Sequence, residues 1–110
     1  MSFPDPAGVV VSVAPTDTVV ITANVRSVAR ASLQVDNLDG AQTFAGTIER
    51  RVADTGAWAP STLGDFSSVA AGQSVMADLD VAGTADIRLV GTMSGAGGDV
   101  RAFLKYGASR

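Results

Sequence analysis

Residues 44–58 read FAGTIERRVADTGAW, and this stretch decides how the chain can fold. From Phe44 onward, apolar or small residues fall on one side of an extended chain and mostly polar residues fall on the other, which predicts a β-strand. Turn residues follow as far as Gly56, and the chain then returns with Trp58, its only tryptophan. A strand, a glycine turn and a returning aromatic residue are typical of a hairpin, and we expect Trp58 to plug the end of the core.

Segments of the same kind recur along the chain at intervals of about ten residues, separated by Pro, Gly, Asn and Asp. No long segment has helical periodicity. The sequence therefore predicts an all-β fold, a single-domain antiparallel β-sandwich of about seven or eight short strands, with a small β-barrel as the alternative. The sandwich spans residues 9–107, after an extended proline-containing arm at 1–8 and before a short tail at 108–110.

Two segments of this pattern carry more specific expectations. Residues 61–72 lack regular alternation, and we expect a loop that lays Leu63, Phe66 and Val69 on the core. Residues 74–81 and 84–92 alternate cleanly on either side of a glycine, and we expect them to pair as a hairpin.

The composition excludes several classes of function. The 110 residues include no Cys and no His, so thiolate or imidazole metal sites and His-based catalytic triads are impossible. We therefore expect neither an enzyme nor a bound cofactor. A net charge of −3 with scattered basic residues disfavours nucleic-acid binding, which needs basic clusters. The N-terminus lacks the pattern of a signal peptide and no apolar run is long enough for a membrane span, so we expect no membrane association.

Three carboxylates form the strongest cluster for metal binding in the sequence. If residues 74–92 form a hairpin, Asp78, Asp80 and Asp86 all lie on its outward face. Hard cations such as Ca²⁺ prefer oxygen ligands, but the sequence has no calcium-loop motif. A solvated strand face with Arg88 as an ionic partner explains the same residues. The sequence favours this second interpretation, and the three Asp residues are only weak candidates for a metal site.

Apolar side chains on faces that should be polar are more informative. Val20, Met76, Val90 and Phe103 interrupt outward faces, and exposed apolar patches mark protein–protein contacts. A face assignment that is wrong by one residue is the alternative explanation. The arm at 1–8 offers a second contact, because its prolines keep it extended. The candidate partner interface therefore comprises Phe3, Pro4, Pro6, Val20, Met76, Val90 and Phe103.

Two parts of the chain, residues 31–58 and 66–95, carry a family resemblance. The matching residues are Phe44, Gly46, Thr47, Glu49, Arg50, Trp58, Gly72, Arg88 and Gly95. Their order and spacing resemble those of small β-sandwich structural proteins of tailed bacteriophages, which occur as capsid decoration proteins and as tail or neck components. The sequence departs from that pattern at residues 53–56, where the family has a turn of the DGG type.

The resemblance implies a structural virion protein without catalytic residues. Its most direct form is a capsid decoration protein that binds an assembled lattice through protein–protein contacts, with the major capsid protein or another virion protein as partner. A tail or neck protein is the alternative within that class, and a homo-oligomer fits it too. Such a protein is made in the host cytoplasm and ends in the virion. Outside that class, the residues leave open a carbohydrate- or calcium-binding module that uses Trp58 or the three Asp residues.

Overall fold

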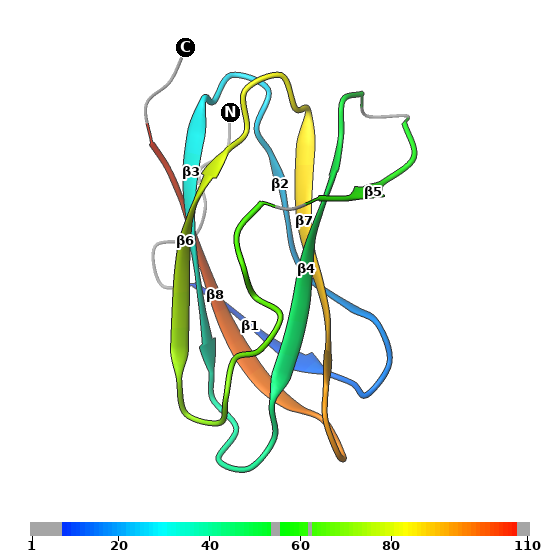
Figure 1. Ribbon diagram of the computed structural model, residues 1–110, viewed down its shortest axis with the longest axis vertical. Helices are drawn as coiled ribbons and strands as arrows, with labels where there is room; N and C mark the ends of the chain where they lie inside the picture. The colour runs from blue at the N-terminus through cyan, green and yellow to red at the C-terminus, as the bar shows by residue number, and fades with distance from the viewer. Residues whose placement is uncertain (1–7, 54–55, 62, 108–110) are drawn as a thin grey trace.

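The computed structural model describes residues 8–53, 56–61 and 63–107, and these residues form eight β-strands and no helix. They accordingly include no helix that could cross a membrane. Figure 1 shows the strands running mostly along the long axis of the molecule. The strands are β1 (Val9–Val13), β2 (Thr18–Asn24), β3 (Arg30–Asn37), β4 (Phe44–Arg51), β5 (Ala59–Pro60), β6 (Ser74–Asp80), β7 (Asp86–Met93) and β8 (Gly98–Tyr106).

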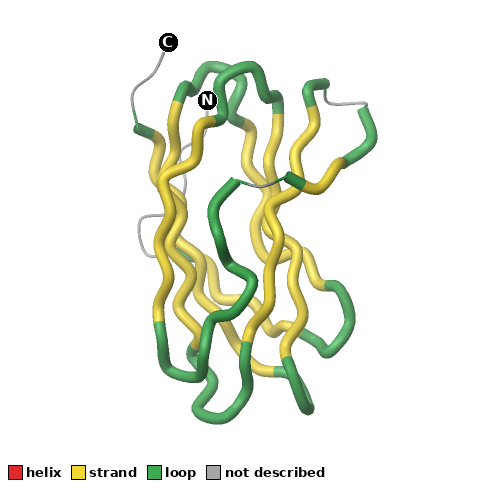
Figure 2. The backbone as a smooth tube through the Cα atoms, in the orientation of Figure 1, coloured by secondary structure: helices red, strands yellow, loops and turns green. Residues whose placement is uncertain are grey.

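The strands form two four-stranded antiparallel sheets. Sheet A has the order β1-β8-β3-β6, and sheet B has the order β2-β7-β4-β5. Figure 2 shows the loops that connect these strands, many of which cross from one sheet to the other. The predicted antiparallel β-sandwich is confirmed, and the alternative of a closed barrel is wrong because the strands divide into two separate sheets.

The first four strands pair with the last four in reverse order along the chain. β4 pairs with β5, β3 with β6, β2 with β7 and β1 with β8. The chain is therefore one long antiparallel ribbon, folded back on itself between β4 and β5 and rolled into two layers. This arrangement is a jelly roll, the eight-stranded double-sheet form of the β-sandwich. The hairpin predicted from residues 44–58 is confirmed, and it is the bend of the whole ribbon.

Apolar side chains from both sheets fill the space between the layers. Phe44, Leu33 and Leu89 are among the largest, and each is at most 1% exposed. Gly46 and Gly91 lie opposite each other on β4 and β7. A Cβ added at Gly91 would lie 2.5 Å from the Phe44 ring. Both strands therefore need glycine at this point so that the ring can occupy the space beside them.

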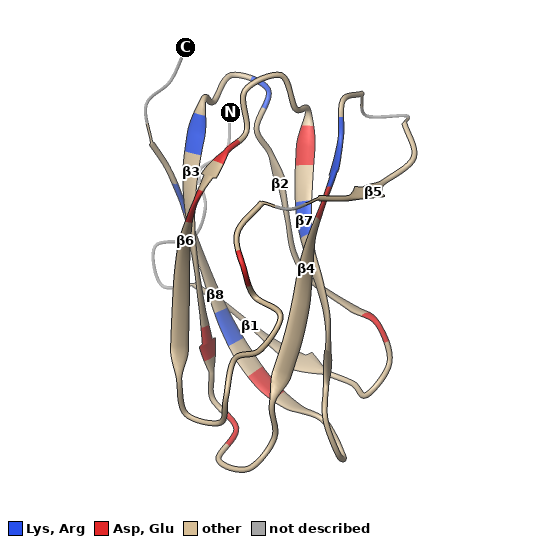
Figure 3. Ribbon diagram, in the orientation of Figure 1, with Lys and Arg blue, Asp and Glu red and all other residues tan. Residues whose placement is uncertain are grey.

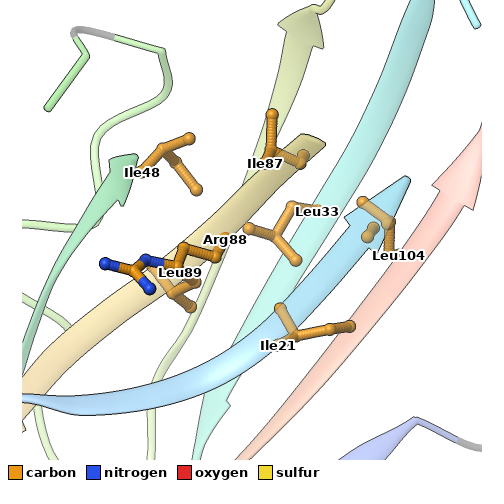
Figure 4. Close-up of a pocket in the computed structure, with 8 residues that line it drawn as sticks. Ile21, Leu33, Ile48, Ile87, Arg88, Leu89 and Leu104 are labelled. Carbon is orange, nitrogen blue, oxygen red and sulfur yellow. The ribbon is translucent and has the colours of Figure 1, made fainter. Parts of the chain in front are cut away.

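One cavity lined by described residues lies inside the sandwich. Figure 4 shows a small cavity between the sheets, with a volume of about 10 Å³, which is the lower limit for a single water molecule. Ile21, Leu33 and Leu104 border it, whereas the guanidinium of Arg88 extends away from them. This cavity cannot hold a sugar ring, and the candidate sites described below lie on the surface of the sandwich.

Residues 63–72 close one side of the sandwich. This segment follows β5 of sheet B and leads to β6 of sheet A, and Figure 1 shows it passing between β4 and β6. Phe66 and Val69 are buried, and backbone hydrogen bonds join both residues to β4. Leu63 is half-buried against the core. The prediction of a loop that lays these three side chains on the core is confirmed.

A buried polar side chain joins the end of β3 to two other segments. Asn37 is 2% exposed. Its Nδ2 donates hydrogen bonds to the carbonyl oxygens of Gln42, at 2.8 Å, and Val69, at 3.0 Å. Its Oδ1 accepts a hydrogen bond from the N–H of Asp39 at 3.0 Å. One side chain therefore fixes the loop after β3 against the segment that closes the sandwich.

The structure corrects two expectations about strand faces and pairing. β2 has a bulge between Val19 and Ile21, where an extra residue interrupts the pairing with β7. The bulge turns Val20 inward, where it is 4% exposed, so its predicted outward position is wrong. The predicted hairpin of residues 74–92 is also wrong, because β6 pairs with β3 in sheet A whereas β7 lies between β2 and β4 in sheet B.

Candidate interaction surfaces

The outward side of sheet A carries a short apolar row. Met76 on β6, Gln34 on β3 and Phe103 on β8 lie opposite one another across three neighbouring strands. Met76 is 67% exposed, and Gln34 and Phe103 are half-buried. Val10 on β1 lies one row away, opposite Arg101, and is 52% exposed. The Met76 face consists of Met76, Gln34, Phe103 and Val10.

Polar side chains border the Met76 face. Gln34 Nε2 donates a hydrogen bond to Asp36 Oδ1 at 2.9 Å. The guanidinium carbon of Arg101 lies 6.0 Å from the centroid of the Phe103 ring. Gln34 lies between Met76 and Phe103, so the face combines apolar side chains with polar ones, as protein–protein contacts do. The Met76 face therefore has the chemistry of a docking surface.

The other residues of the predicted interface lie elsewhere. Val20 is in the core, and Val90 faces out of sheet B, on the opposite side of the sandwich from Met76. The structure thus brings Met76 and Phe103 together and leaves Val20 and Val90 apart from them. The predicted arm contacts lie outside the described residues, and these are Phe3, Pro4 and Pro6.

The outer side of sheet B carries a charged cluster around the tryptophan. Arg51 Nε donates to Asp86 Oδ2 at 2.9 Å, and Arg88 Nε donates to Glu49 Oε1 at 2.7 Å. Both guanidinium carbons also lie over the Trp58 ring, 4.4 Å and 4.5 Å from its centroid. Figure 3 shows acidic and basic residues close together on β4 and β7 near β5. These five residues make up the Trp58 cluster.

The prediction that Trp58 plugs the core is wrong. Its side chain is half-buried and does not belong to the core cluster. Arg50 pairs with Ala59, so the adjacent position on β5 brings Trp58 beside Arg51, whose side chain points out of the sandwich. A cation over an aromatic ring contributes roughly 0.5–1 kcal/mol at an exposed site. The Trp58 cluster therefore holds the bend of the ribbon against the outside of sheet B.

The three candidate carboxylates do not gather into a site. Asp78 and Asp80 face out of sheet A, and Asp86 faces out of sheet B. Asp78 accepts a hydrogen bond from Ser32 Oγ at 2.8 Å, and Asp80 accepts one from the N–H of Ala82 at 3.3 Å. Within residues 8–53, 56–61 and 63–107, no three His, Cys, Asp or Glu side chains are placed to hold a metal ion. The sequence places the three carboxylates on one face because it predicts a hairpin for residues 74–92. They do not share a face, since β6 and β7 lie in different sheets.

The Trp58 cluster has a sequence signal that the strand patterns alone did not reveal. Glu49 precedes Arg51 along β4, and Asp86 precedes Arg88 along β7. Antiparallel pairing reverses one strand, so each arginine meets a carboxylate when these strands are neighbours. The signal becomes usable only when β4 and β7 are known to pair, and they are not consecutive strands.

The fold has relatives among solved structures, whereas no protein-family model and no curated protein sequence matches the chain. The crystal structure of PirA is similar with a TM-score of 0.59 and 12% identity, covering 97% of this chain and 95% of that one. The SPBc2 prophage-derived protein YomS is similar with a TM-score of 0.52 and 14% identity, covering 96% and 97%. A chain of the infectious bursal disease virus Gx strain has a TM-score of 0.54 and 11% identity, over 92% of this chain.

A larger viral chain and a carbohydrate-binding module are among the structures with a similar fold. This chain spans only 29% of the infectious bursal disease virus chain. A chitosan-binding module of a chitosanase/glucanase from Paenibacillus sp. IK-5 is also similar, with a TM-score of 0.51 and 16% identity, over 89% of this chain and 76% of that one. Identities this low establish the β-sandwich fold alone, and the function has to be argued from the surface.

Proposed function

We propose that this protein is a structural virion protein, and specifically a capsid decoration protein that binds an assembled capsid lattice through protein–protein contacts. The observation that carries the proposal is the Met76 face, whose methionine lies on the edge strand β6 and is 67% exposed. Covering apolar surface removes it from water and favours association. The partner in this proposal is the major capsid protein or another virion protein, and the protein resides in the virion.

The architecture supports the same class of function. Jelly rolls occur in viral capsid domains, and structures with a similar fold include a viral chain and a prophage-derived protein. A tail or neck protein would share these features. Decoration is the finer proposal because a sheet face presented by many identical copies suits a repeating lattice, where repetition adds avidity to a small contact. We also propose that the protein is not an enzyme, since it has no His or Cys to act as base or nucleophile.

Cosedimentation with purified capsids that lack the protein tests this proposal. Met76→Lys places a charge at the most exposed apolar side chain of the Met76 face, and we expect the apparent affinity to fall by about tenfold or more. Val52→Lys is the matched control, because Val52 is 78% exposed just after β4 and lies away from that face. Deletion of residues 1–7 tests the arm separately. Equal binding by the wild-type protein and Met76→Lys would contradict the assignment of this face to the lattice.

A carbohydrate-binding module is the second candidate, and Trp58 is the observation that favours it. The ring is half-buried on the outer side of sheet B, and the fold is shared with a chitosan-binding module. The guanidinium groups of Arg51 and Arg88 already lie over the ring, which leaves less of it for a sugar to stack on. Because Trp58 is the only tryptophan, a fluorescence titration with chitosan oligosaccharides reads this site directly. An unchanged emission spectrum would eliminate this candidate.

A further inference from the structure

β1 is an edge strand of sheet A, and one side of it has no strand partner among the described residues. Within the described part of the chain, its only strand neighbour is β8. The N–H of Leu38 donates a hydrogen bond to the carbonyl oxygen of Asp99. Backbone groups of successive residues in a strand point to opposite sides, so Asp99 and every second residue after it on β8 form their hydrogen bonds with the β3 side. The intervening residues of β8 bond to Val9, Val11 and Val13 of β1. The N–H and C=O groups of Val10 and Ser12 therefore point to the free edge.

The other sheet edges carry features that discourage pairing with another chain. β2 has its bulge at Val20. β6 carries Asp78 and Asp80, and residues 63–72 bond to the edge of β4 beyond β5. β1 reads VVVSV and has no charge, proline, glycine or bulge. Edge strands without such features readily accept another strand, so β1 is the exposed pairing site of the sandwich.

We propose that β1 pairs with β1 of a second copy of this chain, antiparallel, about a twofold axis at Val11. This register places Val10 opposite Ser12 of the second copy, and both residues have free backbone groups. The twofold axis creates two Val10–Ser12 pairs, and each pair exchanges two backbone hydrogen bonds. At the axis, Val11 lies opposite Val11 of the second copy, and this pair is not hydrogen-bonded. All five residues of β1 find a partner in this register, which no shifted register achieves.

The absence of charge on β1 favours a second copy as the occupant. The strand itself is neutral, so two copies oppose no like charges. On β8, Arg101 lies beside Val10 and Asp99 lies beside Ser12. In the dimer, Arg101 of one copy and Asp99 of the other lie three strand spacings apart in the same row, about 14 Å, so their attraction is screened and the row opposes no like charges. The two copies of sheet A become one continuous eight-stranded sheet, with both Met76 faces on the same side.

Sedimentation equilibrium of the whole chain tests the dimer without any capsid, so its failure is separate from failure of the proposed function. We expect the wild-type protein to have twice the chain mass of 11.1 kDa. Val10→Pro removes one free-edge N–H at an edge position where proline is tolerated, and we expect it to halve the mass. Val10→Thr keeps the N–H and should remain a dimer. Circular dichroism checks that the proline variant is folded, and Ser12→Pro repeats the test if Val10→Pro does not fold.

Disulfide trapping tests the register, since the chain has no cysteine of its own. Non-hydrogen-bonded antiparallel pairs have Cα atoms about 4.5 Å apart, within the range that a disulfide spans. Val11→Cys should therefore form a covalent dimer under mild oxidation much faster than Val52→Cys, whose residue is more exposed. Three results would overturn the proposal. The wild-type protein could stay monomeric at concentrations up to about 1 mM, the dimer could be unaffected by both proline substitutions, or the two cysteine variants could be trapped equally fast.

Discussion

Asn37 offers the most direct test of how the loops of this sandwich are held together. Asn37→Ala removes three hydrogen bonds, to Gln42, Val69 and Asp39, from a side chain that is 2% exposed. Each such bond contributes roughly 0.5–1.5 kcal/mol. We therefore expect the free energy of unfolding to fall by about 2–4 kcal/mol. With an m value of roughly 1.5 kcal/mol/M, the urea midpoint should fall by about 2 M.

Asn37→Asp tests the two donated hydrogen bonds separately from packing, because it keeps the shape of the side chain and replaces the Nδ2 donor group with an oxygen. The ionised carboxylate would face the carbonyl oxygens of Gln42 and Val69, so at neutral pH we expect it to destabilise the fold more than Asn37→Ala does. Burial next to two carbonyls raises the pKa of this carboxyl in the folded state above its unfolded value. The penalty is therefore absent below the unfolded pKa of about 3.9 and appears as the pH rises through the folded value.

Urea denaturation followed by tryptophan fluorescence measures these effects. Asn24→Ala is the matched control, because Asn24 is exposed and its Oδ1 accepts only a 3.2 Å bond from the N–H of Arg26 among the bonds described for that atom. We expect this control to change stability by less than about 0.5 kcal/mol. Equal losses for Asn37→Ala and Asn24→Ala, or an aspartate variant as stable as the alanine variant at neutral pH, would refute the reasoning.

Three further predictions concern other parts of the sandwich. Gly91→Ala should lower stability by about 1–3 kcal/mol because its Cβ would overlap a buried aromatic ring, whereas Gly40→Ala, with nothing within 4 Å, should leave urea denaturation unchanged. A double-mutant cycle of Trp58→Ala and Arg88→Ala should give a coupling of about 0.5–1 kcal/mol in thermal unfolding, and zero coupling would contradict the cation–π contact. Burial raises the pKa of Tyr106, so the stability it contributes is complete below pH of about 10 and is lost as the pH rises through the raised folded value. Tyr106→Phe should remove that pH dependence, and unfolding measured at about pH 9 and about pH 11 checks it.

Local alternation identified buried faces wherever a strand is regular. Leu33 and Val35 on β3 and Leu79 on β6 are all buried as the period of two requires. β2 breaks the rule because its bulge adds one residue, so Val19 is exposed and Val20 is buried. A bulge depends on how the strand meets its neighbour, and the alternation of a single strand does not contain that information.

Strand pairing could not be predicted from the same pattern. The backbone N–H of Val81 bonds to Ala29 in the layer of sheet A, and four residues later the N–H of Ala85 bonds to Arg51 at the end of β4 in sheet B. The turn around Gly83 therefore carries the chain from one sheet to the other, although its residues suit a tight hairpin equally well. This one error placed the three candidate carboxylates on a common face and hid the charge pairs of the Trp58 cluster.

The rolled-ribbon pairing determines which parts of the protein can form while the chain is still being synthesised. The β4–β5 pair is local, and each pair further along the ribbon is brought close by the one before it, so no long loop has to close in a single step. Sheet B can form completely once β7 has been synthesised, because it consists of β2, β7, β4 and β5. Sheet A remains in two pieces, β1 and β3-β6, until β8, which follows the other seven strands in the chain, has been synthesised and enters between them. A chain that ends before β8 would keep two unpaired strand edges, and such edges make incomplete chains prone to aggregation.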